Sequence, residues 1–317
     1  MFRRVAAFAM VVAAACAPRA RGVTREAPIP LSGAWMQELA ASPGAGVLRV
    51  DLRALRADAL YAPALRALDV ALSGRALSPS VDVSRALSAA GEVVVLFEAQ
   101  TPPVVVLRGV PASIDPTRAA GADGAAQWRR SPLGVAYADA FDFVPAQGAL
   151  FVLLDRSWVI SAGEGEQRLR RALGREHGRP VFAELADVDP APVSLHLSGG
   201  ALRAMAPRAH VSLLEPMFRE LRSFDLSLRT GASADARTDA VTLELAYAAP
   251  AEAERARGLV GDLIGAFTRR GGPRWAWLST AAVAQAGSVV HVRASLPEWL
   301  LGALGDDAMR PAAPDPL

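Results

Sequence analysis

Short runs of β-branched residues recur along the chain and constrain its fold more than any other feature. Residues 224–229 and 241–247 alternate apolar and polar side chains with a period of two, which is typical of strands with one face in water. Further strands are expected at residues 47–52, 92–97, 104–107, 134–138, 150–154, 158–161, 193–197, 277–284 and 289–294. Many short strands joined by turns predict a mostly antiparallel sheet structure.

Helical patterns lie between these strands. Residues 251–267 carry an apolar stripe at helical spacing, with the charged side chains mostly off it. Weaker helical patterns occur at residues 54–72, 163–173 and 216–221. Because strands and helices are interspersed, the sequence favours an α+β fold.

A faint internal repeat divides this pattern in two. Val47 begins VLRVDLRALRA and Val193 begins VSLHLSGGALRA, so in both places a strand runs into Ala-Leu-Arg-Ala. Coincidence in a chain rich in these residues is the alternative explanation. We expect two tandem halves, each a mostly antiparallel sheet with helices packed on one face, of the split βαβ or ferredoxin-like kind.

The chain is expected to fall into successive parts. Residues 1–15 form a signal peptide, and residues 16–44 form a lipidated N-terminus and a flexible tether rich in Pro, Gly and Arg. Residues 45–186 and 187–309 form the first and second α+β halves, with a proline-rich break between them. Residues 310–317 form a disordered tail.

The N-terminus carries an export signal. Arg3 and Arg4 precede an apolar stretch at residues 5–15, which suits a signal sequence and is too short to span a bilayer. Alanines then lead directly to Cys16, the only cysteine of the chain. This sequence resembles the bacterial lipobox, in which the cysteine thiol receives lipid and the chain is cut before it. The alternatives are ordinary cleavage after Ala15, with Cys16 a bystander, and an uncleaved anchor.

A single cysteine also limits how the fold is held together. An exported chain with one cysteine cannot form an internal disulfide, so both halves must be stable by packing alone. In lipoproteins an Asp after the modified cysteine often signals inner-membrane retention. Ala17 occupies that place here, so we expect a lipid-anchored protein of the outer membrane.

Longer stretches resemble one group of proteins. VLRVDLRALRADALYAPAL, WVISAGEGEQRLRRAL and the final passage from VTLELAYA to VVHVRASLPEWLLGAL look like uncharacterised secreted lipoproteins of bacteria with GC-rich genomes. The resemblance covers most of residues 45–305. It implies an envelope lipoprotein and brings no activity and no site residues with it.

Charge and histidine placement exclude several classes of function. The formal net charge is +2, and cleavage before Cys16 removes two arginines and no acid, so the mature chain is close to neutral. No basic patch interleaved with aromatic residues is present, and we expect no nucleic-acid partner. No two of the 4 histidines lie at metal-ligand spacing, so no metal or cofactor is expected. His196 and His291 fall in predicted strands and are interpreted as surface or hydrogen-bonded strand residues.

Nucleophilic catalysis has no support in the sequence either. The chain has no GxSxG motif, and lipid would block its only thiol. We therefore expect a protein that is not an enzyme.

An arginine stripe is the most distinctive charged feature. Arg168, Arg171, Arg175 and Arg179 repeat at helical steps and would share one helix face. Guanidinium groups can bind phosphates or carboxylates with paired hydrogen bonds, so an anionic lipid head group or an acidic envelope protein is a candidate partner. The alternative is a solvated helix face.

Three functions are consistent with these features. The first is a non-catalytic envelope lipoprotein that binds or scaffolds other proteins. The second is a carrier or sensor of an apolar ligand, and Trp275 and Trp277 are candidates for its wall. The third is an envelope hydrolase with unconventional catalytic residues. The first needs no active site and is the function we expect.

Overall fold

The computed structural model describes much of the chain between residues 45 and 296. The described residues are 45–57, 65, 86–98, 101–118, 128–131, 138–143, 148–153, 156–162, 166–167, 169, 191–205, 220–229, 239–270 and 273–296. No helix among them is long and apolar enough to cross a membrane.

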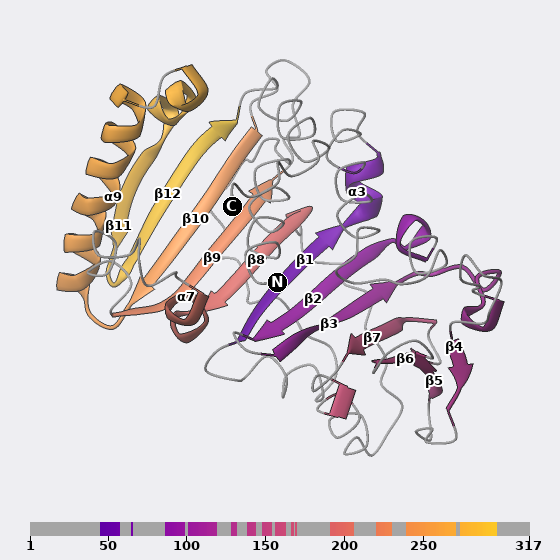
Figure 1. The fold of residues 1–317 in the computed structure, drawn as a ribbon. Coiled ribbons are helices and arrows are strands. Elements are labelled where there is room, and N and C mark those ends of the chain that lie inside the picture. The colour runs from indigo at the N-terminus through magenta and orange to yellow at the C-terminus, as the bar shows by residue number, and fades with distance from the viewer. Residues whose placement is uncertain are drawn as a thin grey trace, which may run out of the picture.

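All described strands belong to one 12-stranded antiparallel sheet (Figure 1). Its order is β11-β12-β10-β9-β8-β1-β2-β3-β7-β6-β5-β4. The strands are β1 (Ala45–Asp51), β2 (Glu92–Glu98), β3 (Thr101–Arg108), β4 (Trp128–Arg130), β5 (Ala138–Phe143), β6 (Gly148–Leu153), β7 (Trp158–Ala162), β8 (Val193–Ser198), β9 (Leu221–Arg229), β10 (Asp239–Tyr247), β11 (Ala282–Ala286) and β12 (Val289–Leu296). The helical elements are α3 (Leu52–Arg56), η2 (Pro116–Arg118), α7 (Gly199–Met205), α9 (Pro250–Arg270) and η3 (Pro273–Thr280).

The α+β class is confirmed, but the expectation of two separate sheets is wrong. Strands β1 and β8 pair antiparallel in the middle of the order, from Gly46 opposite Leu197 to Val50 opposite Val193. Separate sheets would leave each of these strands with an unpaired row of backbone N–H and C=O groups, and their pairing satisfies both rows. The split βαβ arrangement is present in the second half, where α9 joins β10 to the parallel strand β11 and β12 lies between them, antiparallel to both. The order of the whole half, β8-β9-β10-β12-β11, differs from that of a ferredoxin-like sheet.

The strands nevertheless repeat on the two sides of this junction. Outward from β1 the order is β2, β3, β7, β6, and outward from β8 it is β9, β10, β12, β11. Leu48 lies opposite Leu195, and these two leucines occupy the same place in the repeat when the Ala-Leu-Arg-Ala segments are superposed. The same superposition maps the pair of Val47 with His196 onto the pair of Ser194 with Arg49. An approximate two-fold axis therefore passes between the two leucines.

The Ala-Leu-Arg-Ala segments make the same local contacts in both halves. Asp51 Oδ1 accepts a hydrogen bond of 3.0 Å from the backbone N–H of Ala54 at the start of α3. Ser198 Oγ accepts one of 3.0 Å from the backbone N–H of Ala201 at the start of α7. Both are helix N-caps, which satisfy backbone donors that have no partner inside the helix. The repeat in the sequence is therefore also a structural repeat.

The arginine of each segment also anchors its helix to the next strand. Arg56 donates to the carbonyl of Ala90, shortly before β2, at 2.5 Å. Arg203 donates to the carbonyl of Leu221, the first residue of β9, at 3.2 Å. An arginine is suited to this position because its guanidinium presents several donors on a long apolar stem.

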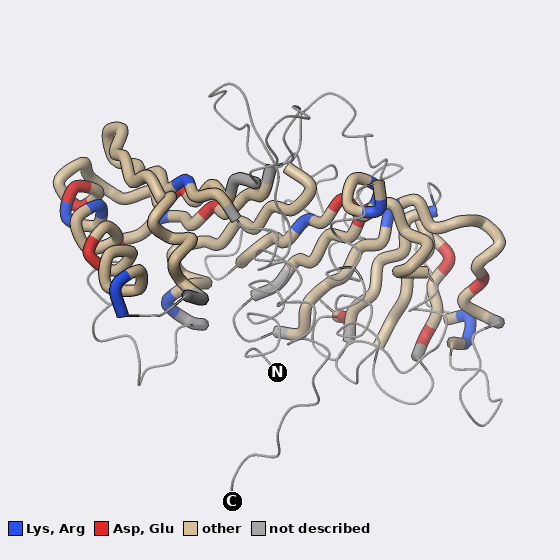
Figure 2. Tube along the Cα trace, turned by 90° about the horizontal axis from the view of Figure 1, so that it is seen from above, with Lys and Arg blue, Asp and Glu red and all other residues tan. Residues whose placement is uncertain are grey.

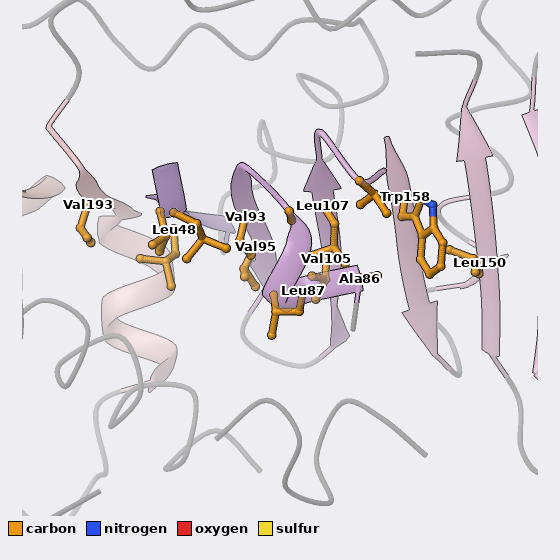
Figure 3. Close-up of a cluster of buried hydrophobic side chains, with 14 of the residues drawn as sticks. Leu48, Ala86, Leu87, Val93, Val95, Val105, Leu107, Leu150, Trp158 and Val193 are labelled. Carbon is orange, nitrogen blue, oxygen red and sulfur yellow. The ribbon is translucent and has the colours of Figure 1, made fainter. Parts of the chain in front are cut away.

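The core lies on both faces of the first half of the sheet. One face carries a large cluster that includes Leu48, Val95 and Trp158, and α3 joins it through Leu52 and Leu55 (Figure 3). The same face continues into the second half, where side chains of α9 cover β10 and β12. The opposite face of the first half carries a second cluster of buried residues. Its members are Val47, Val94, Leu96, Val104, Val106, Ala140, Ala149, Phe151, Leu153, Val159 and Leu169.

Several local expectations can be checked against these elements. The short gaps between the strands expected at residues 150–154 and 158–161, and between the last two expected strands, are tight turns, in which Arg156 and Gly287 lie in the left-handed region, with φ of 67° and 59°. The strand expected at residues 277–284 is present but starts later, because η3 extends to Thr280 and β11 runs from Ala282 to Ala286. Most of the helix expected at residues 216–221 lies outside the described residues, and Leu221 already belongs to β9.

The long helix α9 is rotated relative to the predicted stripe. Its fully buried residues are Ala253, Ala256 and Val260, whereas Leu259 and Phe267 stay exposed. The small alanines let the helix approach the sheet closely, and this favours the alanine side of the helix over the side with larger residues.

A buried ion network crosses the first half of the sheet. Glu92 on β2 accepts hydrogen bonds from Arg49 on β1 and from Arg108 on β3, the second at 2.6 Å. Arg49 and Glu92 are only 5% and 4% exposed. A carboxylate shared by two guanidinium groups offsets the cost of removing these charges from water.

We predict that Glu92→Ala lowers the free energy of unfolding by about 3–5 kcal/mol, because it leaves two buried guanidinium groups without their counter-charge. Asp139→Ala is the matched control. It removes the ion pair with Arg130, in which both side chains are mostly exposed, and should cost at most about 1 kcal/mol. Urea denaturation of both variants measures the difference, and equal costs would contradict a stabilising role for the network.

Candidate binding face on strands β8 to β12

One face of the second half of the sheet is polar. Residues on β8, β9, β10 and β12 that point away from α9 form cross-strand rows of hydroxyl and charged side chains. One row is Ser194, Ser227, Thr242 and Arg293. The next row is His196, Asp225, Glu244 and His291. We call the second row the histidine–carboxylate row and the whole surface the polar face.

The histidine–carboxylate row places ionisable side chains directly opposite one another on four adjacent strands. His196 Nδ1 lies 2.5 Å from Asp225 Oδ1, and His291 Nδ1 lies 3.0 Å from Glu244 Oε1. Asp225 and Glu244 form the central cross-strand pair. The exposed fractions of these side chains lie between 38% and 44%, so the row is accessible and still partly shielded from water.

The central pair is unfavourable for the fold taken alone. Two carboxylates directly opposite each other on neighbouring strands repel. Each is instead paired on its outer side with an imidazole, and Ser223 Oγ also donates to Asp225 Oδ2 at 2.9 Å. The row thus holds two carboxylates side by side, although the stability of the sheet does not depend on charged residues at these positions.

The first half shows what the sheet alone requires at these positions. Arg49 follows Leu48 as His196 follows Leu195, and the row that crosses the sheet from Arg49 is Arg49, Val94, Val106 and Val159. These valines are buried in the second cluster. Three of the four equivalent positions are therefore apolar in the first half, and the fourth, Arg49, is buried and paired with Glu92. In the second half all four positions are ionisable and partly exposed.

The environment of His196 perturbs its titration. The hydrogen bond to Asp225 raises the pKa of His196 above 6.5, burial lowers it by a smaller amount, and the charge of Asp225 adds a further increase. The folded chain therefore binds this proton more tightly than the unfolded chain does.

The contacts of the row do not match a nucleophilic triad. A triad places an imidazole between a serine hydroxyl and a carboxylate, so that the imidazole can take the serine proton. Here the hydroxyl of Ser223 donates to Asp225, and Asp225 lies between Ser223 and His196. Among the described residues no group of His, Cys, Asp and Glu is placed to hold a metal ion. The arrangement is suited to recognition of a positively charged group.

The sites expected from the sequence lie elsewhere. Cys16 is outside the described residues, and so are Arg168, Arg171, Arg175 and Arg179. Trp275 and Trp277, expected on a strand, lie on η3. His196 and His291 do lie in strands, as expected, and the hydrogen bonds to Asp225 and Glu244 explain their place there.

Sequence reasoning missed the histidine–carboxylate row. The alternation of each strand places His196, Asp225, Glu244 and His291 on polar faces of their own strands. What joins them is the register between strands, and no pattern within one strand contains that register.

We predict that NMR titration shows His196 with a pKa above 6.5, and that Asp225→Asn moves this pKa down while Ser223→Ala keeps it raised. Because the folded pKa lies above the unfolded value, the stabilising contribution of His196 is fully present below about pH 6.5 and is lost as pH rises through the folded pKa. The stability difference between wild type and Asp225→Asn, measured by urea denaturation, should therefore be larger at pH 6 than at pH 8.5. A difference that is constant with pH would contradict the pairing.

Comparisons with known proteins find one similar solved structure. No family model and no curated protein matches it. A solved structure titled "Structure of crystal form I of TP0453" is similar, with 11% sequence identity and a TM-score of 0.49, over 89% of this chain and 99% of that one.

Proposed function

We propose that the protein is a lipid-anchored binding protein of the cell envelope, without a catalytic role, and that it holds a basic partner protein on its polar face. The observation that carries this proposal is the histidine–carboxylate row. It presents two adjacent carboxylates in an accessible, hydrogen-bonded row on a rigid sheet.

Charge complementarity supports a basic partner. With both imidazoles neutral, the four side chains of the row carry two negative charges, since only Asp225 and Glu244 are ionised. A guanidinium or ammonium group of a partner could lie between the carboxylates and form charge-assisted hydrogen bonds with both. Protonation of His196, whose pKa is raised, would reduce the negative charge of the row as pH falls and weaken such binding.

The flanking rows support recognition of a protein surface. Ser194 and Thr242 lie beside the charged row and offer partly exposed hydroxyl groups that both donate and accept hydrogen bonds, whereas Ser227 between them is buried. An extended sheet face of this kind suits a broad protein surface better than a small ligand, which is usually held in a concave site.

The proposed localisation depends on Cys16. Its lipobox-like surroundings would attach the chain to the outer membrane through lipid, and residues 17–44 would serve as a tether. An anchored binding protein gains affinity for other envelope proteins because both are confined to one compartment.

We predict that a photo-crosslinker incorporated at Thr242 in intact cells gives a discrete protein adduct. The double variant Asp225→Asn and Glu244→Gln should lose this adduct because it removes both charges and retains similar shapes. A crosslinker at Arg257, exposed on the outer side of α9, is the positional control and should give no such adduct. An adduct that persists in the double variant would contradict recognition through the carboxylates.

The same cells also test lipid attachment and membrane localisation. Wild type should incorporate labelled palmitate and Cys16→Ala should not, and the Thr242 adduct should weaken in Cys16→Ala because the protein no longer stays at the membrane. Equal lipid labelling of the two forms would contradict lipid attachment at Cys16 and would leave the carboxylate test unaffected.

A further inference from the structure

Strand β11 forms one end of the described sheet, and its outer edge has no strand partner among the described residues (Figure 1). The first half of the repeat shows which kind of partner can pair with the equivalent strand edge. Strand β6 pairs with β7 in the first half as β11 pairs with β12 in the second, and the outer edge of β6 is occupied by β5 in antiparallel register. The outer edge of β11 corresponds to a site that is already filled in the first half.

The difference between the halves arises from the chain that precedes each strand. Between β3 and β6 the described chain forms η2 and then β4 and β5, and these two strands extend the sheet. Between β10 and β11 it forms α9 and η3 instead. The second half thus supplies a helix where the first half supplies the covering strands.

The two ends of the sheet also differ in their chemistry. The terminal strand β4 is three residues long, and its Arg129 and Arg130 are exposed. Short length and exposed charge are the usual means by which proteins prevent pairing at an edge. Strand β11 has the sequence AVAQA and carries neither charge nor proline, so it lacks these two forms of protection, and α9 is the element that lies beside it (Figure 1).

Exposed apolar side chains gather at the same end. Among the described residues, the exposed large hydrophobic side chains are those of Leu259, Phe267 and Trp275, on α9 and η3. Helix α9 contacts β11, and the rings of Phe267 and Trp275 lie 5.2 Å apart between centroids. Figure 2 shows α9 at the end of the molecule that is remote from β4, with acidic and basic residues interspersed along it.

We propose that the outer edge of β11 and the apolar side chains beside it form the interface between two copies of this chain, which join antiparallel, edge to edge, about a two-fold axis at Ala284. This axis pairs all residues of the 5-residue strand. It sets Ala284 opposite its own copy and Ala282 opposite Ala286 of the other copy, so that only small side chains meet on the exposed face.

The identity of the occupant follows from self-complementarity. An uncharged strand that is symmetric in its small residues can pair with a copy of itself without bringing like charges together, and the junction of β1 with β8 already joins two similar half-sheets in this way. A 5-residue strand pair alone buries less than the roughly 1,000 Å² that a stable interface needs. The exposed side chains of α9 and η3 supply further apolar area.

The test is sedimentation equilibrium of the full chain, purified from membranes in density-matched detergent. Wild type should sediment at twice the mass of one chain. Ala284→Arg should sediment as a monomer, because it sets two like charges opposite each other at the axis. Ala112→Arg, at an exposed turn of the first half, is the matched control and should remain a dimer. Circular dichroism confirms that both variants fold.

Cross-linking tests the register independently. Ala284→Cys should link two copies through a reagent that spans one cross-strand pair, about 5 Å. Ala282→Cys alone should not, since its copies would lie about 13 Å apart along the strands, whereas a mixture of Ala282→Cys with Ala286→Cys should link. Wild type, which retains Cys16, is the background control.

Monomeric wild type at all concentrations, or a dimeric Ala284→Arg, would overturn the proposal. Monomeric wild type whose tryptophan fluorescence shifts on lipid vesicles would assign the apolar side chains to membrane contact instead. If Ala284→Arg fails to fold, the cross-linking pattern decides, and linkage of Ala282→Cys equal to that of Ala284→Cys would overturn the register. Ala284 and Ala282 lie opposite His291 and Arg293 at the end of the polar face. These outcomes are nevertheless read from the mass and the cross-linking of two copies, whereas the Thr242 adduct reports on the basic partner, so failure of one proposal is distinguishable from failure of the other.

Discussion

The antiparallel pairing of β1 with β8 is the interaction on which the rest of the structure depends. It converts two half-sheets into one sheet, satisfies the backbone groups of both central strands and places Leu48 beside Leu195 on the core face. Because the chain has one cysteine, located before the fold begins, no disulfide can hold the halves together. The junction must rely on backbone hydrogen bonds and on apolar burial, which is nearly complete around it.

The two halves of the repeat share a framework and differ in the surfaces that they carry. Both retain the strand order, the helix N-cap and the arginine that anchors the helix. The first half covers its second face and fills it with valine, and it ends in a short charged strand. The second half leaves that face open and ionisable, and it replaces the covering strands with α9. The first half thus buries both faces of its sheet, whereas the second half leaves the polar face and the apolar side chains of α9 and η3 exposed.

Local patterns could be predicted from the sequence, whereas long-range pairing could not. Most strands, both tight turns and α9 follow from side-chain periodicity and turn residues. Strands β4 and β5 were missed because WRR and ADAFDF are short and mix charge with aromatic residues. The single sheet and the histidine–carboxylate row depend on register between distant strands, and Val193 shows no local sign that it pairs with Val50. The faint Ala-Leu-Arg-Ala repeat indicated two equivalent halves, and it did not indicate the strand pairing that joins them.

The most direct test of a single sheet centred on β1 and β8 is native-state hydrogen exchange. Residues 46–50 and 193–197 should exchange only through global unfolding, with one common free energy that matches the value from urea denaturation. Leu48→Asp should then lower the protection of both halves together. The opposite result would be amides of β8, β9 and β10 that exchange through their own opening while β1 and β2 stay protected, because such behaviour would show two independent sheets.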